Sequence, residues 1–145
     1  MMRRLLCGCA VVLMAMGCVT VDAGPKPYEA QKVGVACTQA EIMAVIRDRI
    51  RENTWSLQTE DTSIGFIEAF SRETNDDGLI TRQRWKFTVA RGEVSVTMVV
   101  ERKFSVNSHS WESTNLVCGE FQYFCEKQEL EAIRAKLDGR GCKSP

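Results

Sequence analysis

The segment ITRQRWKFTVARGEVSVTMVVERKF, residues 80–104, predicts two long strands joined by a tight turn. In its first half, basic side chains at positions 82, 84 and 86 alternate with apolar ones at 85, 87 and 89. The second half alternates in the same way, and the pair Arg91-Gly92 between them is suited to a short hairpin turn. Alternation with a period of two indicates that each strand turns one face to a core and the other to water.

Two further strands are expected on the N-terminal side of this hairpin. TWSLQTE, residues 54–60, alternates apolar and polar side chains, and SIGFIEAFSRE, residues 63–73, is mostly apolar on both faces. Gly65 within the second segment indicates a bulge or a close approach of another backbone. The run NDDG, residues 75–78, then marks a turn. Four strands joined by short turns form an antiparallel meander.

A helix is expected on each side of the meander. Thr38 and Glu41 have the spacing of a capping box, and the residues after them carry an apolar helical stripe. A second stripe predicts a helix from Glu126 to Leu137, and Gly139 lies where a C-terminal cap would be. We therefore predict an α+β domain over residues 37–145, with a four-stranded antiparallel sheet and two helices packed on one face.

The N-terminal end has the pattern of an export signal. Arg3 and Arg4 precede an uncharged apolar run, Leu5 to Gly17, which is shorter than the roughly 20 residues of a transmembrane helix. We expect a signal peptide over residues 1–17 and a linker over residues 18–36, which contain Gly24, Pro25 and Pro27 and lack an apolar period.

Charge and motif content exclude several function classes. Removing the leader lowers the number of basic side chains from 19 to 17 against 19 acidic ones, a net charge of −2. Nucleic acid is therefore not an expected partner, because its binding depends on basic neutralisation of phosphates. The sequence has no glycine-rich phosphate loop and no nucleophile elbow, so we expect no cofactor.

The cysteines predict disulfides. Two of the seven leave with the leader, and an even set remains in the domain: Cys37, Cys118, Cys125 and Cys142. Zinc is the alternative, but zinc ligands usually come in closer pairs than any found here. Cys125 and Cys142 bracket a helix of about 18 Å, too long for one bridge. Antiparallel helices would bring Cys37 near Cys142, so we expect Cys37–Cys142 and Cys118–Cys125.

Arg82, Arg84 and Lys86 are candidate contact residues. They form a basic row on the water-facing side of one strand, which could bind an anionic lipid headgroup, a cell-wall polymer or an acidic protein. Cations at alternate strand positions also serve solubility and protect sheet edges, and this alternative remains open.

The polar loop over residues 105–115 contains His109 and Trp111. His109 is the only histidine of the chain, so a histidine-dependent hydrolase or metal-dependent enzyme would have to use it. Neighbouring serines do not supply a catalytic triad, and the sequence shows no companion metal ligands, so a solvated loop histidine is the simpler interpretation. Trp111 could cap the core or anchor a contact.

The segment Ala15-Met16-Gly17-Cys18 resembles the lipobox of bacterial lipoproteins. The resemblance implies that Cys18 receives a lipid and becomes the mature N-terminus. Val19 differs from the aspartate of an inner-membrane retention signal, which implies an outer-membrane anchor facing the periplasm. Cleavage after Ala23 is the alternative, and it would release a soluble periplasmic or secreted protein.

Trp55, Leu57 and Glu60 form a W-x-L-x-x-E motif, and the run Gly65-Phe66-Ile67-Glu68-Ala69 follows it. With this pattern, residues 55–137 resemble small uncharacterised lipoprotein domains of helix, four strands, helix order. The resemblance carries over no activity. Our first hypothesis is a non-enzymatic envelope lipoprotein that binds an envelope protein or an anionic polymer and reaches the membrane through its lipid. The alternatives are the enzyme using His109 and a small lipid or ligand binder with a cavity between sheet and helices.

Overall fold

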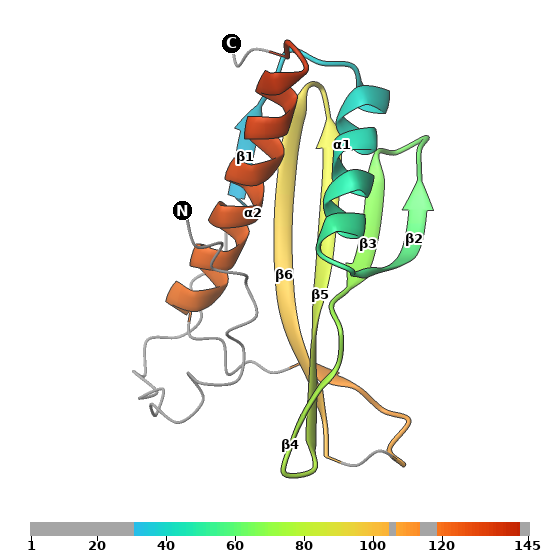
Figure 1. Cartoon of the computed structure of the whole chain (residues 1–145). Coiled ribbons are helices and arrows are strands. Elements are labelled where there is room, and N and C mark those ends of the chain that lie inside the picture. Colours follow the sequence, from blue (N-terminus) through green and yellow to red (C-terminus); the bar gives the residue numbers. More distant parts are fainter. Residues whose placement is uncertain (1–30, 105–106, 114–118, 143–145) are drawn as a thin grey trace.

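A computed structural model describes residues 31–104, 107–113 and 119–142 (Figure 1). The α+β class is confirmed, and two helices accompany an antiparallel sheet. The elements in chain order are β1 (Gln31–Gly34), α1 (Gln39–Glu52), β2 (Ser56–Asp61), β3 (Phe66–Phe70), β4 (Thr74–Asp76), β5 (Leu79–Ala90), β6 (Glu93–Lys103), β7 (Glu112–Ser113) and α2 (Gly119–Gly139).

The sheet contains seven strands, so the prediction of four was wrong in number. The four expected strands are β2, β3, β5 and β6, and they lie side by side in the order β6-β5-β3-β2 as a meander. The additional strands are short: β1 and β7 pair with β6, and β4 pairs with β5. Runs of two to four residues cannot show an alternating pattern, so pairing with a long neighbour makes them strands.

Strand β1 lies inside the range 18–36 that the sequence assigned to a linker. Residues Gln31–Gly34 pair with Val96–Glu93 on the outer edge of β6, and the next residue, Val35, is buried. The amide of Val35 donates a hydrogen bond to the carbonyl oxygen of Gly92 at 2.7 Å. The folded domain therefore includes residues before Cys37.

The β5–β6 hairpin turns at Arg91 and Gly92, which both have positive φ, 54° and 74°, as a two-residue type I′ turn requires. Its ladder runs from Ala90 opposite Glu93 to Ile80 opposite Lys103. Gly65 is required for a different reason, the close approach of another backbone segment. A Cβ atom there would lie 2.2 Å from the carbonyl oxygen of Val89. The predicted close approach is confirmed at this glycine.

Both helices lie on one face of the sheet, α1 over β5 and β2 and α2 over β6 and β1 (Figure 1). Between the layers lie the large apolar side chains of the hairpin and of both helices, each contributing about 1.5–3 kcal/mol by burial. Trp85 has no exposed surface, and its ring stacks on Trp55 with 4.7 Å between centroids. The fully buried side chains include Trp85, Phe87, Val96, Met98, Ile42, Ile46, Ile133 and Leu137.

Helix α1 begins with the predicted capping box. The Glu41 amide donates to the Thr38 hydroxyl at 3.3 Å, and the Thr38 amide donates to the Glu41 carboxylate at 2.9 Å. The Thr38 hydroxyl also donates to the Glu41 carboxylate at 2.7 Å, and this bond, together with the one from the Thr38 amide, lowers the pKa of the Glu41 carboxyl. Helix α2 runs antiparallel to α1 and is longer than predicted, since it begins at Gly119 rather than Glu126.

The antiparallel helices bring Cys37 and Cys142 together in a disulfide, with Cα atoms 5.3 Å apart. This part of the cysteine prediction is confirmed. Cys125 is buried, but Cys118 lies outside the described residues, so the pairing of Cys118 with Cys125 stays a prediction. Cys18 and the expected signal peptide also lie outside the described residues.

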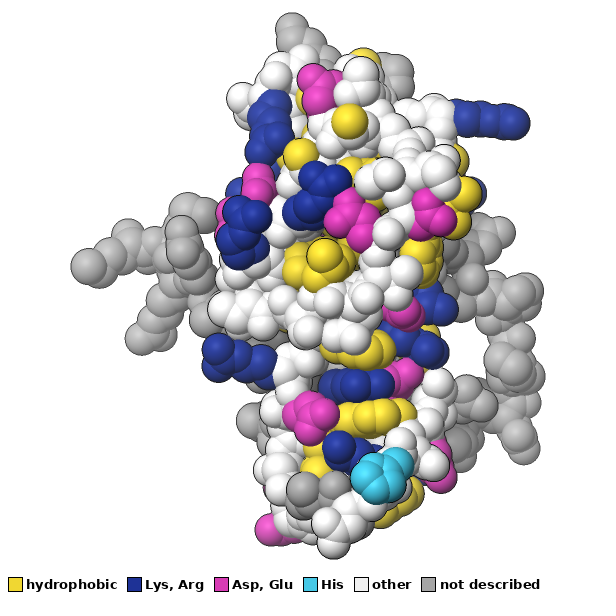
Figure 2. Space-filling model, turned by 90° about the vertical axis from the view of Figure 1, so that its right-hand side faces the viewer, with side chains coloured by type: hydrophobic (Ala, Val, Ile, Leu, Met, Phe, Trp, Pro, Cys, Tyr) yellow, Lys and Arg dark blue, Asp and Glu magenta, His cyan; other side chains and the backbone are white. Residues whose placement is uncertain are grey.

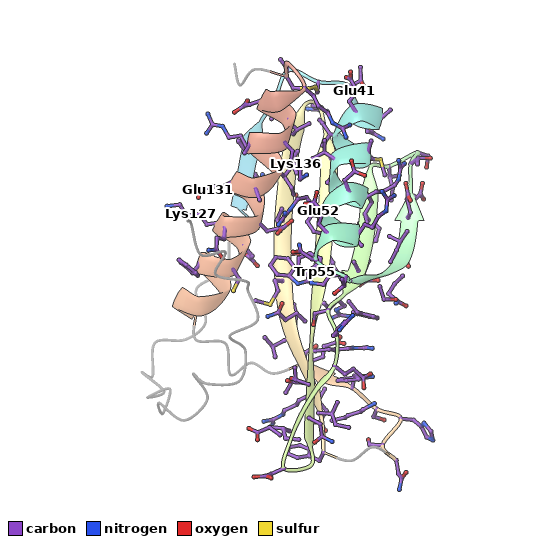
Figure 3. All side chains as sticks on the ribbon, in the orientation of Figure 1. Glu41, Glu52, Trp55, Lys127, Glu131 and Lys136 are labelled. Atoms are coloured by element: carbon purple, nitrogen blue, oxygen red, sulfur yellow. A yellow bond between two sulfur atoms is a disulfide. The ribbon has the colours of Figure 1, made fainter. Side chains whose placement is uncertain are left out.

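Ion pairs join the two helices along their line of contact. The Arg49 guanidinium donates to both oxygens of Glu129, from Nε at 3.0 Å and from Nη2 at 2.9 Å, and this pairing raises the pKa of Arg49. Glu52 and Lys136 also pair, and Figure 3 shows their side chains between the helices. Glu129 is nearly buried, so removing Arg49 would leave a poorly solvated charge.

The long hairpin continues past the helical layer, where β4 and β7 flank it (Figure 1). None of the helices in the described ranges combines the length and apolar character that crossing a bilayer requires.

Candidate interaction surface on the open face of the sheet

The face of the sheet opposite the helices carries the predicted basic row. Arg82, Arg84 and Lys86 project from β5 on the side away from Trp85, as the alternation predicted. The register places Glu101 of β6 opposite Arg82 and Glu68 of β3 opposite Lys86. Two carboxylates from neighbouring strands thus lie among the three cations.

The cations are held unequally by these carboxylates. Arg82 binds Glu101 tightly, since its Nε and Nη2 atoms both lie 2.8 Å from Oε2. Arg84 Nε lies 3.2 Å from Glu101 Oε1 and 3.9 Å from Glu68 Oε1. Lys86 Nζ lies 4.0 Å from Glu68 Oε1. Three cations share two carboxylates, and the contacts of Glu68 are the longest.

Arg82 also belongs to a column that we call the aromatic stack, formed by Phe70, Arg82, Trp111 and Lys103. The guanidinium carbon of Arg82 lies 3.7 Å from the Phe70 ring centroid and 3.9 Å from that of Trp111. Lys103 Nζ lies 4.4 Å from the Trp111 centroid. Figure 2 shows dark blue and yellow side chains alternating along the lower half of the molecule. Such cation–π contacts attach the loop to the sheet.

Trp111 is therefore fixed by its contacts with Arg82 and Lys103. It is half-buried on the open face, outside the helix-covered core, so it does not cap that core. Its contacts with two cations make it a packing partner of Arg82 and Lys103 and leave part of the ring exposed.

His109 lies two residues before Trp111 and is exposed. Within the described ranges no hydrogen bond or ion pair joins the imidazole to another residue, and its neighbour Ser108 donates to the Ser110 carbonyl oxygen at 3.4 Å. Among the described residues, no three or more histidine, cysteine, aspartate or glutamate side chains form a group that could hold a metal ion.

The sequence interpretation identified the cations but missed the residues that hold them. The sequence did contain the information needed to place Glu101. A two-residue turn at Arg91-Gly92 fixes the hairpin register, and this register sets Glu101 opposite Arg82. Phe70 could not be placed beside Arg82 in the same way, since β3 reaches β5 through a longer connection.

Glu126 is a second residue that the sequence interpretation missed as a special position. Its side chain has no exposed surface, and its Oε1 atom accepts a 2.6 Å hydrogen bond from the Met98 amide on the outer edge of β6. Burial raises the pKa of the carboxyl from 4.5 to about 7, although the bond from Met98 acts in the opposite direction. Met98 lies between the parts of that edge paired with β1 and with β7.

Comparisons with known proteins do not supply a family for this chain. No family of known proteins matches the sequence, and a search of curated proteins found no match.

Proposed function

We propose that the protein is a non-enzymatic lipoprotein of the bacterial envelope, anchored in the outer membrane through Cys18, whose open sheet face binds another envelope component. The observation that carries this proposal is the open face itself, where a row of cations and an ordered aromatic stack remain accessible on the side that the helices leave uncovered. Exposed cations and aromatic rings are residue types that binding surfaces favour.

The disulfide supports the expected compartment. Cys37 and Cys142 are joined although 105 positions separate them in the chain. Structural disulfides persist in oxidising compartments such as the periplasm and are rare in the cytosol. This agrees with the signal-like Met1–Gly17 segment and with a lipobox-like sequence ending at Cys18.

The arrangement on the open face supports binding by a preformed surface. Arg82 is stacked between two rings and bound to Glu101, so its position is settled before a partner arrives. Lys86 is less restrained, with 42% of its side chain exposed against 17% for Arg82. A surface that is ordered in advance loses less conformational entropy on binding.

The anchor is tested by mass spectrometry of the mature N-terminus, using protein purified from membranes of a bacterial host. We expect a first residue Cys18 carrying diacylglycerol, and a Cys18→Ser variant that accumulates unprocessed or leaves the membrane fraction. A mature chain that begins with an unmodified Gly24 would contradict the anchor.

The binding face is tested by cross-linking in living cells. A photoreactive residue at Thr88, which is exposed beside Lys86 on the open face, should give a discrete cross-linked product with an envelope component. The same residue at Glu131, which points away from the sheet on α2 (Figure 3), should not give that product. If both positions gave the same cross-linked product in equal amount, the open face would not be the binding surface.

The alternative of an enzyme that uses His109 has no geometric observation in its favour among the described residues. The imidazole is exposed, and no described carboxylate forms a hydrogen bond or ion pair with it. The described residues therefore favour the binding function.

A further inference from the structure

We infer that the partner of the open face presents an extended acidic polypeptide segment, which binds across Arg84 and Lys86 and displaces Glu68 from them. This inference rests on the proposed function and names the chemistry of the partner. The surface concerned, which we call the central patch, consists of Arg84, Lys86, Glu68, Phe66 and Thr88 on β3 and β5.

The charge balance of the row favours an anionic ligand. Three cations share two carboxylates, and Glu101 is engaged by Arg82 at hydrogen-bonding distance. Glu68 serves both Arg84 and Lys86 at 3.9 and 4.0 Å, which is the outer limit of an ion pair. At these distances Glu68 forms no hydrogen bond with either cation, and contact of the partly exposed Lys86 with water weakens the pair further. An incoming carboxylate can therefore replace Glu68 without breaking a strong contact.

The spacing of the two cations favours an extended chain. Arg84 and Lys86 are two residues apart on one strand, so their side chains leave the sheet roughly 7 Å apart. Alternate residues of an extended peptide have the same separation. Acidic side chains at positions i and i+2 of a partner segment would thus face both cations at once.

The neighbours of the cations favour a polypeptide over an anionic polymer such as polyphosphate. Phe66 and Phe70 lie on either side of Glu68 in β3, on the same face, and both are half-buried. Their rings offer apolar contacts that a polypeptide side chain can use and a uniformly charged polymer cannot. Thr88, opposite Phe66, adds an exposed hydroxyl group.

The test uses the full mature chain with its Cys37–Cys142 disulfide intact and fluorescent eight-residue peptides of alternating residues. We expect a glutamate–threonine peptide to bind more than about fivefold more tightly than the matching glutamine–threonine peptide. Its affinity should fall as salt is raised from 20 to about 300 mM, because exposed charges are screened. Polyphosphate of similar charge should bind more weakly than the acidic peptide.

Variants of the central patch make the test specific. Lys86→Gln should weaken the acidic peptide about fivefold, whereas Glu68→Gln should tighten it about threefold, because the resident competitor is removed. Lys127→Gln and Glu131→Gln are matched controls, because both residues are exposed on the outer side of α2 (Figure 3). They should leave the affinity unchanged, and equal circular dichroism spectra would confirm that all four variants fold.

Several results would overturn the inference. Equal binding of the two peptides, weaker binding by Glu68→Gln, or tighter binding of polyphosphate than of the acidic peptide would each do so. These results are separable from failure of the proposed function. A Thr88 cross-link in cells without acidic-peptide binding refutes only the partner chemistry, whereas peptide binding without such a cross-link refutes only the proposed role of the face.

Discussion

The two halves of the β5–β6 hairpin are stabilised in different ways. In the half covered by the helices, Trp85, Phe87 and Val96 have no exposed surface and pack into one core. In the half that continues past the helices, Arg82 is stacked between Phe70 and Trp111 and bound to Glu101. The same two strands thus pass from a core held by apolar burial to a surface held by directional contacts.

This difference between the two halves separates the contacts that determine folding stability from those that determine the shape of the surface. Apolar burial is the larger contribution to the free energy of unfolding, whereas cation–π contacts at partly exposed rings such as Trp111 are each worth about 1 kcal/mol. The covered half should therefore determine whether the protein folds, and the extended half should determine the shape of the surface around Trp111.

The largest effect is expected from removing the disulfide that closes the covered half. Replacing both Cys37 and Cys142 with serine should lower the free energy of unfolding by about 5 kcal/mol, because a bridge spanning 105 positions restricts the unfolded chain strongly. Urea unfolding followed by tryptophan fluorescence measures this loss. An unchanged midpoint would show that the bridge has no part in stability.

Truncating a ring inside the core should have the next largest effect. Trp85→Ala removes a fully buried side chain that stacks on Trp55, and it should cost about 4 kcal/mol through lost burial and the cavity left behind. The same urea titration measures it, with Lys127→Ala on the exposed side of α2 as the control. A loss below about 1 kcal/mol would mean that the covered half does not depend on this ring.

Glu126 adds a dependence on pH to the covered half. Its folded-state pKa is raised from 4.5 to about 7, so the folded protein binds the proton more tightly than the unfolded chain. Its contribution to stability is therefore greatest below pH 4.5 and is lost as the pH rises to about 7. Glu126→Gln can still accept the bond from Met98, and at pH 8 it should be more stable than the wild type by on the order of 2 kcal/mol.

The measurement is the unfolding free energy of both proteins at pH 5 and pH 8. The advantage of the variant should shrink at pH 5, where the wild-type carboxyl is largely protonated. An advantage of the same size at both pH values would show that titration of Glu126 is not its cause.

The smallest effect is expected in the extended half. Trp111→Ala removes the contacts with Arg82 and Lys103 but leaves the core intact, so it should lower the free energy of unfolding by about 1 kcal/mol or less. Hydrogen exchange should quicken in residues 107–113 and stay unchanged in α1. A destabilisation as large as that of Trp85→Ala would show that the two halves do not differ in their contribution to the free energy of unfolding.

Sequence patterns predicted the parts of the fold that have long periodic signals. The alternation across residues 80–104 predicted both long strands and the face of each side chain, and the spacing of Thr38 and Glu41 predicted the start of α1. The order of helices and strands then sufficed to pair Cys37 with Cys142. These features depend on local chemistry and on chain direction, which a single sequence contains.

The parts that sequence patterns missed depend on contacts between distant segments. Strand β1 has only four residues and exists through its pairing with β6. Glu126 reads as an ordinary polar residue of a helix, and only packing against the edge of β6 buries it. The basic row was predicted, but its neutralisation by Glu68 required the register between β3 and β5.

The covalent link between Cys37 and Cys142 has a mechanical consequence. Their Cα atoms are 5.3 Å apart in the folded chain, and the bridge keeps them within about 7 Å when the chain between them unfolds. A pull applied to the chain before Cys37 and after Cys142 would bypass the central sheet and both helices. The bridge would shield about 350 Å of extended chain from such a pull. Among the elements that the structure describes, β1 alone lies outside the closed loop and could peel away under tension.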